Sequence, residues 1–187
     1  MADVSVRPAR PADAERIARV QLSTWRTAYS ELLPTAALDV PEVQAAALWL
    51  GAVERPPTPT HRVLVAFERE ELVGFVASGP SGDDGAVELL TLLVEPRWGR
   101  RGHGSRLLAA AVEDWRHDGA TTAECWAFEA DAATRSFLTS AGFEADGTSR
   151  GLDTGEAVQR QLRLHTDVSG ASPHGDGEIA GRAPEAS

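Results

Sequence analysis

One continuous stretch, residues 87–115, constrains the fold of this chain more than any other part of its sequence. It opens with a nearly unbroken apolar run at 87–94, which has the length and composition of a buried strand and which Pro96 ends. A loop rich in glycine and arginine follows it. Apolar residues then recur at helical spacing, at Leu107, Leu108, Ala111, Val112 and Trp115. The stretch therefore predicts a strand, a glycine loop and a helix that packs through one face.

The remainder of the chain alternates between strand and helix patterns, and the whole order reads βααβββαβαββ. The short turns between several strands favour hairpins, and the predicted helix after the glycine loop makes one crossover. This combination indicates an α/β or α+β domain around a central sheet. The predicted strands are 4–7, 63–67, 72–77, 87–94, 123–128, 144–151 and 157–164, and the predicted helices are 11–28, 34–53, 104–117 and 131–140.

The length of 187 residues predicts a single domain, which we assign to residues 1–165. Residues 166–187 are rich in Gly, Ala, Ser, Pro and acidic residues, with almost no large apolar side chains, which predicts a disordered tail. The sequence begins without an apolar signal segment, and it has no run of roughly 18 apolar residues. We therefore expect a cytoplasmic protein with no membrane partner.

Composition excludes whole classes of chemistry. All 18 basic residues are arginine, so the lysine that a phosphate-binding P-loop or a Schiff-base enzyme needs is missing. The single cysteine, Cys125, excludes an intramolecular disulfide and a multi-cysteine zinc site. The histidines show no ligand spacing, so we expect no metal. The net charge of −10 argues against nucleic acid as a partner and is compatible with an amine substrate.

The loop between strand and helix carries the strongest functional signal. Gly102 and Gly104 lack a Cβ atom, which lets the backbone turn sharply and approach a ligand closely. The helix that follows presents free N–H groups and the positive end of its dipole, which together suit a pyrophosphate. Arg100, Arg101 and Arg106 add positive charge. The third glycine of the dinucleotide fingerprint is absent and the segment lies mid-chain, so this is not a Rossmann motif.

Two segments of the sequence carry a resemblance to a known family. The strand end Leu92-Leu93-Val94-Glu95-Pro96 and the loop Arg100-Arg101-Gly102-His103-Gly104-Ser105 resemble the acyl-CoA-binding motif of bacterial members of the GNAT superfamily of N-acetyltransferases. That motif reads Q/R-x-x-G-x-G/A, and its usual Gln or Arg falls here on Gly99, which is a departure. Residues 136–143 resemble the family's second motif, a helix that ends in Gly-Phe. The resemblance covers residues 3–164, and the element order agrees.

The resemblance implies a fold and a cofactor. The fold would be a central mixed, mostly antiparallel sheet of six to seven strands flanked by about four helices. Acetyl-CoA would be the co-substrate, with its pantetheine arm between two strands that diverge at a bulge, around 92–94 and 125–128. The residues that the resemblance assigns to this cofactor are Leu92, Leu93, Val94, Arg100, Arg101, Gly102, His103, Gly104, Ser105 and Asp131.

The resemblance also suggests catalytic groups, although two of the family's usual side chains are replaced in this sequence. Glu88 lies six residues before Val94, which matches the general base of the family's histone-acetylating branch; the alternative is an ordinary strand-edge glutamate. The backbone N–H near Val94 would serve the acetyl oxygen. The tyrosine that many members use to protonate the leaving thiolate falls on Leu138, which cannot donate a proton. Asp131 replaces the usual asparagine at the start of that helix.

In this family the first two helices line the site of the acceptor, the molecule that receives the acetyl group. The resemblance therefore predicts that site beside the first two helices of this chain. Trp25 and Tyr29 lie four residues apart on one helix face, so they either face the substrate or form a core pair. We expect an acetyl-CoA-dependent N-acetyltransferase in which a primary amine, of a small molecule or a protein N-terminus, attacks directly in a ternary complex. The alternative is a non-catalytic protein that binds or senses acyl-CoA. A homodimer is left open.

Overall fold

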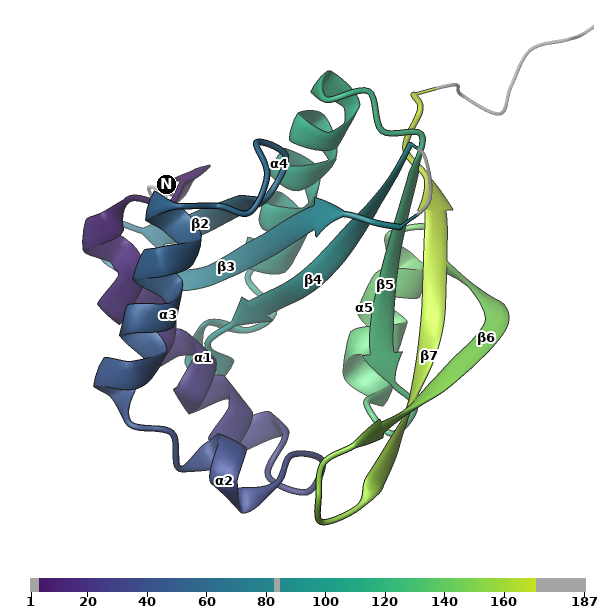
Figure 1. The fold of residues 1–187 in the computed structure, drawn as a ribbon. Coiled ribbons are helices and arrows are strands. Elements are labelled where there is room, and N and C mark those ends of the chain that lie inside the picture. Colours follow the sequence, from purple (N-terminus) through teal and green to yellow (C-terminus); the bar gives the residue numbers. More distant parts are fainter. Residues whose placement is uncertain (1–3, 83–84, 171–187) are drawn as a thin grey trace, which may run out of the picture.

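The computed structural model describes residues 4–82 and 85–170, and within them one seven-stranded sheet organises the molecule (Figure 1). The strand order is β1-β2-β3-β4-β5-β7-β6, and β4–β5 is the parallel pair while the other described neighbours pair antiparallel. The strands are β1 (Val4–Pro8), β2 (Arg62–Glu68), β3 (Glu71–Pro80), β4 (Ala86–Val94), β5 (Thr122–Phe128), β6 (Glu144–Asp153) and β7 (Val158–Asp167). The predicted mixed, mostly antiparallel sheet is confirmed.

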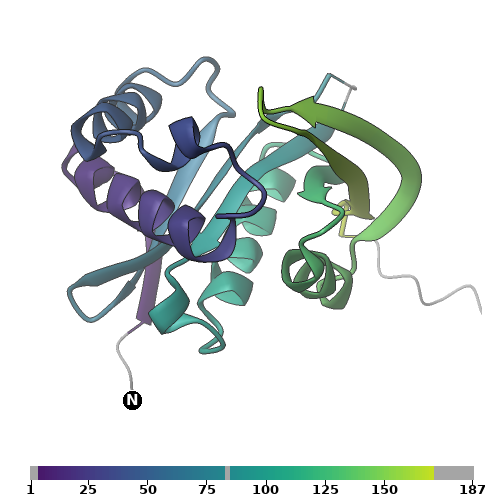
Figure 2. The same cartoon turned by 90° about the horizontal axis from the view of Figure 1, so that it is seen from below.

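Helices cover both faces of this sheet, as the view from below shows (Figure 2). On one face α1 packs on β3 and β4 and is itself covered by α3, while α4 lies on the other face against β2, β3 and β4. The five described helices are α1 (Ala14–Ala28), α2 (Thr35–Leu38), α3 (Glu42–Glu54), α4 (His103–His117) and α5 (Ala132–Ser140), with 3-10 turns η1 (Pro11–Asp13) and η2 (Pro96–Trp98). The result is a three-layer arrangement of helices, sheet and helices.

Each face of the sheet has its own apolar core. On the α4 face, Leu107, Trp115 and Leu138 are buried against the inward residues of β3, β4 and β5. The buried Trp115 indole donates its Nε1–H to Ser78 Oγ at 2.9 Å, so burying it leaves no unpaired donor. On the α1 face, Ile17 and Phe75 centre a second cluster. Burial of these two apolar faces is the main stabilising contribution to the fold.

The predicted single helix at 34–53 is wrong, because the structure divides it into the short α2 and the longer α3. Pro41 lies at the N-cap of α3, and a proline there cannot continue a preceding helix since its ring removes the N–H donor. The residue before a proline is also driven out of helical geometry. The sequence 34–53 therefore makes a turn of helix, a break at 39–41 and a second start.

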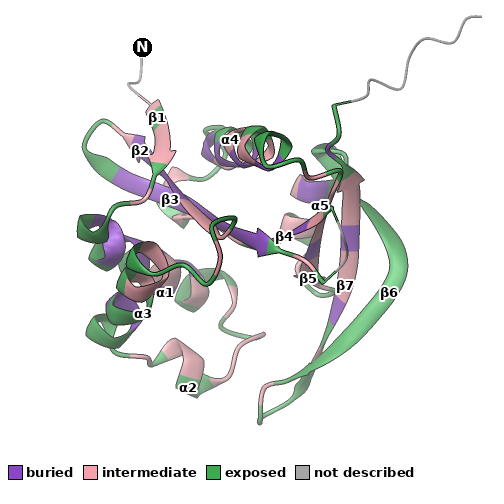
Figure 3. Ribbon diagram, turned by 45° about the horizontal axis from the view of Figure 1, so that its top comes forward, coloured by how far each residue is buried: buried purple, intermediate pink, exposed green. Residues whose placement is uncertain are grey.

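The last strand, β7, extends further along the chain than predicted. Strand β7 runs to Asp167, and the buried Val168 donates its N–H to Thr121 O at 2.9 Å. The boundary predicted at residue 165 is therefore a few residues too early, and residues 171–187 of the predicted tail lie outside the described part of the chain. At the sheet edge, every residue of β6 is exposed (Figure 3). None of the described helices is both long and apolar enough to span a bilayer.

Candidate active site

The parallel strands β4 and β5 pair over only half their length and then separate. Their register runs from Ala86–Thr122 to Leu89–Cys125, and no pair follows. At the same point Leu90 has no partner on β3, because the register shifts there by one residue. Figure 1 shows the two strands diverging below this point. The bulge was predicted at 92–94; the structure places it earlier, at Leu90, while the divergence on β5 begins at Cys125 as predicted.

The bulge leaves backbone groups of β4 facing the gap between the two strands. Glu95 donates its N–H to Val73 O at 2.9 Å, which fixes the phase of the antiparallel ladder with β3. Because bonding residues alternate along such a ladder, Leu92 and Val94 direct their N–H and C=O groups to the other side, where β5 has moved away. These groups are available to an extended ligand, as at an open sheet edge.

The glycine loop, which leads into α4, lines one end of the gap between β4 and β5. Arg100 and Gly102 both adopt left-handed backbone conformations, with φ of 60° and 82°, and their turns aim the start of α4 at the cleft. The first helical bond is Arg106 N–H to Gly102 O at 3.1 Å. The amides of His103, Gly104 and Ser105 therefore have no acceptor within the helix, and free amides at a helix N-terminus suit an anion.

The three arginines that the sequence assigns to this loop point in different directions. Arg100 lines the cleft. Arg101 turns outward, where its guanidinium lies 3.3 Å from Glu68 and 4.8 Å from the ring centre of Trp98. Arg106 folds back and donates to the carbonyl oxygen of Arg101 at 3.0 Å. In the described structure, only Arg100 of the three brings its charge to the cleft.

His103 is the least expected member of the loop. Its side chain has no exposed surface, and its Nε2 lies 2.9 Å from Glu68 Oε2, at the end of β2. Its other ring nitrogen, Nδ1, is buried without a protein partner. Sequence reasoning missed Glu68, because it lies 35 residues away on another strand and no motif marks it. The pair fixes the start of α4 to the sheet.

The gap between β4 and β5 opens into a cavity of about 820 Å³ that the glycine loop also lines. Of the predicted site residues, Glu88 and Arg101 do not line it. The predicted residues that do line it are Trp25, Tyr29, Leu92, Leu93, Val94, Arg100, Gly102, His103, Gly104, Ser105 and Asp131. Residues from eight helices and strands, far apart in sequence, thus meet along one cavity.

The end of the cavity farthest from the glycine loop is aromatic. It is lined by Trp25 of α1, Tyr29 at the C-cap of α1, Trp49 of α3 and Trp126 of β5. The Tyr29 ring meets Phe128 edge-on with centroids 6.0 Å apart, and its hydroxyl lies 3.4 Å from Thr134 Oγ1. Burial raises the pKa of Tyr29 to about 12, so this hydroxyl keeps its proton at neutral pH. Trp25 and Tyr29 pack against the core of the α1 face and also line the cavity. Their contact with a substrate stays a prediction.

Three residues of the predicted chemistry lie beside the cavity or in its wall. Glu88 is in register with Glu124 on β5, on the sheet face opposite the buried Val87 and Leu89. Leu138 is buried in the core, so the position of the family's tyrosine is occupied by a packing residue. Cys125 is buried, and its burial, followed by the charges of Glu88 and Glu124, raises its pKa to about 12. Such a thiol is unreactive as a nucleophile.

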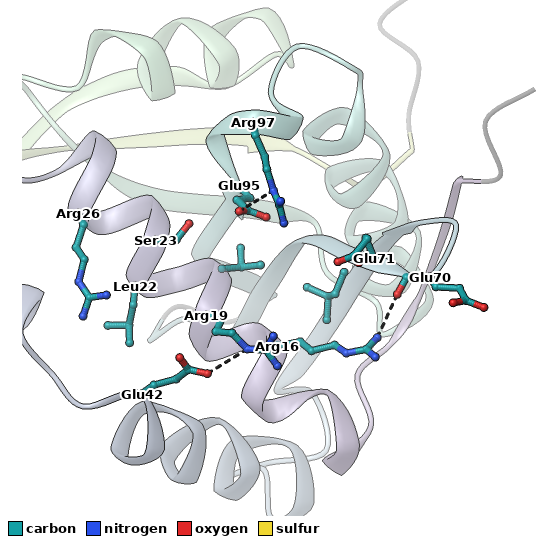
Figure 4. A pocket seen from close by; sticks show the side chains of 12 residues that line it. Arg16, Arg19, Leu22, Ser23, Arg26, Glu42, Glu70, Glu71, Glu95 and Arg97 are labelled. Atoms are coloured by element: carbon teal, nitrogen blue, oxygen red, sulfur yellow. Dashed lines mark hydrogen bonds and ion pairs between the residues drawn. The ribbon is translucent and has the colours of Figure 1, made fainter.

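A second cavity, about 430 Å³, lies on the outer side of α1 and holds mainly paired charges (Figure 4). Arg19 Nε lies 3.0 Å from Glu42 Oε1, and Arg97 Nε lies 2.9 Å from Glu95 Oε1. Because these charges pair with one another, we assign no chemistry to this cavity. Within residues 4–82 and 85–170, no three His, Cys, Asp or Glu side chains are grouped as metal ligands.

Comparisons with known proteins agree with this geometry. The acetyltransferase (GNAT) family model matches residues 21–143. PaiA N-acetyltransferase from Thermoplasma acidophilum, solved with coenzyme A, superposes with a TM-score of 0.71 at 16% identity, covering 88% of this chain and 99% of that one. Ribosomal-protein-alanine N-acetyltransferase from Brucella melitensis gives a TM-score of 0.71 at 21% identity, with coverages of 87% and 99%.

A third structure, YncA from Salmonella typhimurium with its cofactor acetyl-CoA, gives a TM-score of 0.68 at 18% identity and covers 91% of this chain and 98% of that one. No curated protein sequence matches this chain significantly. At these identities the solved structures establish the fold, while the matched family model covers most of the sheet, the glycine loop and α5.

Proposed function

Because this chain belongs to the GNAT acetyltransferase family, we propose that it transfers an acetyl group from acetyl-CoA to the nitrogen of a primary amine. One observation carries the proposal: the free amides at the start of α4 and the unpaired strand edge of β4 border the same cavity. A phosphate site and a site for an extended amide-bearing arm are thus continuous. The cofactor-bound structures of similar fold support the same occupant.

The described residues fit acetyl-CoA. The amides of His103, Gly104 and Ser105 and the Arg100 guanidinium would hold the pyrophosphate. The backbone groups of Leu92 and Val94 would pair with the pantetheine amides in the manner of an added strand. The Nδ1 of His103, a residue that lines the cavity, is buried without a protein partner. The cofactor supplies the activated acetyl thioester.

The chemistry then needs three things from the protein. An N–H directed into the gap, from Val94, donates to the acetyl oxygen as its negative charge grows. Glu88 takes the amine proton through water, from the sheet face that α1 and α3 cover. A nitrogen–carbon bond forms as the carbon–sulfur bond breaks, and the departing thiolate takes a proton from solvent, because Leu138 offers none. The amine attacks directly, with no acyl-enzyme, since Cys125 is an unreactive buried thiol.

Thiol release from acetyl-CoA, measured across a panel of primary amines and confirmed by the mass of the acetylated product, tests this function. We expect amine-dependent release of coenzyme A. The buried Leu138 favours one competitor, a protein that senses acyl-CoA without catalysis. Tight binding of acetyl-CoA with no turnover on any amine would establish that competitor and reject the enzyme.

A further inference from the structure

The cavity has two chemically different ends, and the difference bears on the acceptor. Three residues with ionisable side chains line it: Arg100, His103 and Asp131. Arg100 and His103 belong to the glycine loop. The Asp131 carboxylate accepts the N–H of Thr134 at 2.9 Å and caps α5, so its charge is already opposed by the positive end of that helix. Asp131 also lies beside Tyr29, so it is the one acidic residue that the described lining residues bring to the aromatic end.

The aromatic end is instead built for an apolar body. Trp25, Tyr29, Trp49 and Trp126 supply four ring systems from three elements. Trp49 is fixed in place, because its Nε1–H donates to Gln21 Oε1 at 2.6 Å and its ring meets Phe75 edge-on at 4.8 Å. The side chains that complete this wall are Leu33, Leu90 and Leu152.

Two of these leucines are unusually exposed for their size. Leu90 at the bulge is 53% exposed and Leu152 on β6 is 38% exposed. Apolar surface left open inside a cavity stabilises an apolar ligand when that ligand covers it. A second ammonium group, by contrast, would lose its hydration here, which is costly, and the one carboxylate among the lining residues, that of Asp131, already accepts the N–H of Thr134.

The mouth of this end is narrowed by two segments distant in sequence. Glu156, at the tip of the β6–β7 hairpin, accepts the N–H of Thr35 at the start of α2 at 3.1 Å. Figures 1 and 2 both show the hairpin tip beside α2. Leu33 and Leu152, which line the cavity, lie two and four residues from the two contacting residues, so the contact is close to the aromatic end.

We propose that the acceptor is a small arylalkylamine, with one primary amine joined by a short chain to an aromatic ring. The ring packs among the tryptophans while the amine points toward the gap between β4 and β5. This inference rests on the proposed function for the reaction, but the binding it describes can be measured without turnover.

The test compares kcat/KM for phenethylamine and tryptamine with putrescine, spermidine and an alanine-ended tripeptide, using acetyl-CoA and the full chain. We expect the arylalkylamines to exceed the diamines and the peptide by about tenfold or more, which is the discrimination that a few methylene-sized apolar contacts give. Calorimetry measures binding of phenethylamine to the coenzyme A-loaded protein separately. Preference for putrescine, spermidine or the peptide would overturn the inference and leave the proposed function intact.

Binding of phenethylamine without acetylation of any amine would reject the proposed function and support the inference. Absence of both binding and turnover with phenethylamine would overturn the inference. As a variant test, Leu152→Glu places a carboxylate at the aromatic end, so it should lower kcat/KM for phenethylamine and raise it for putrescine. Val158→Glu is the matched control, because Val158 is an exposed apolar residue of the same hairpin that does not line the cavity. The wild-type panel decides the question even if Leu152→Glu fails to fold.

Discussion

The carboxylate of Glu68 and the imidazole of His103 meet at 2.9 Å and join the end of β2 to the start of α4. Glu68 is also 3.3 Å from the Arg101 guanidinium, so one carboxylate holds two residues of the glycine loop. The loop is thereby held against the sheet before any ligand binds, which lowers the ordering cost of binding.

Glu68→Gln keeps the shape of the side chain and removes its charge. We expect a loss of about 1–3 kcal/mol in unfolding free energy, the usual cost when a buried hydrogen-bonded group loses a charged partner. We also expect a several-fold higher KM for acetyl-CoA at nearly unchanged kcat, since the loop is displaced but the reacting groups are not. Chemical denaturation and steady-state kinetics measure both. Glu70→Gln, an exposed neighbour, is the control, and an unchanged KM in Glu68→Gln would show that the pair does not position the loop.

Arg100 combines a strained backbone with a useful charge. A non-glycine residue at a φ of 60° costs about 1 kcal/mol, so Arg100→Gly should raise stability by about that amount. It should also raise the KM for acetyl-CoA, because the cleft loses its one loop guanidinium. Arg69→Gly is a matched control: Arg69 has a φ of 57° and lies outside the cleft, so it should gain the stability without the KM change. Equal KM values for the two variants would remove Arg100 from cofactor binding.

The two motif glycines should respond differently to alanine. Gly102 has a φ of 82°, so Gly102→Ala should cost about 1–2 kcal/mol and weaken acetyl-CoA binding by distorting the turn. A Cβ on Gly104 would lie 3.4 Å from Phe137 Cζ and 3.6 Å from Leu92 Cδ2, which is ordinary contact. Gly104→Ala should therefore keep cofactor affinity and gain up to about 1 kcal/mol from helix propensity. Thermal unfolding measures the stability of the two variants, and calorimetric titration measures their affinity for coenzyme A. Equal changes in Gly102→Ala and Gly104→Ala would contradict this expectation.

Much of the fold is readable from local pattern, because strand and helix periodicities are strong between residues 62 and 140. The pattern fails where local signals compete: Pro41 interrupts a helical composition that otherwise continues across it. The bulge at Leu90 is invisible for another reason. The run 87–94 is apolar on both sides, so it shows no alternation from which a one-residue shift of phase can be detected.

The candidate site also has parts that the sequence predicts and parts that it does not. The glycine loop and its helix follow from sequence, because a backbone anion site needs only glycine and a helix start. The direction of Arg101 does not follow, since Glu68 and Trp98 attract it from outside the motif. The aromatic end required the fold as well: Trp49 and Leu152 come from α3 and β6, and no spacing relates them. The assignment of individual residues to the cofactor stays a prediction.

Two buried groups, Tyr29 and Cys125, should make the free energy of unfolding depend on pH in the alkaline range. Burial raises the pKa of Tyr29 from 10.0 and that of Cys125 from 9.0, each to about 12. When unfolded, both groups release their protons near the ordinary values. Between pH 9 and 12 the folded state therefore holds more protons, and stability falls as pH rises through this range. The chain has no lysine and only one tyrosine and one cysteine, so few other groups titrate there.

Urea denaturation at pH 8 and pH 11 measures this loss. Tyr29→Phe and Cys125→Ser should each reduce the difference between the two pH values, whatever their effect on stability at pH 8. A pH dependence that neither substitution changes would mean that these groups are not the source. Both substitutions together should leave little of the wild-type slope.

Glu88 offers the sharpest test of the chemistry. Val87 and Leu89 point into the α4-side core, so the alternation of a strand directs Glu88 to the opposite face, where α1 and α3 border the aromatic end. Glu88 does not line the cavity itself, so a water must carry the proton. Glu88→Gln should lower kcat/KM near pH 7 by about 10²–10⁴-fold, the usual contribution of a general base. The rate should recover partly at high pH, where more of the amine is already neutral.

Glu124→Gln is the informative comparison, because Glu124 is the register neighbour of Glu88 on β5 and its carboxylate accepts from the Ser81 hydroxyl. A charge effect common to both glutamates would change the two pH–rate profiles equally. A base role predicts that only Glu88→Gln loses the acidic limb of the profile, since only that limb reports deprotonation of the base in the free enzyme. If Glu88→Gln keeps the wild-type profile, water alone removes the amine proton. Glu88 would then be an ordinary strand residue, the alternative that its sequence position leaves open.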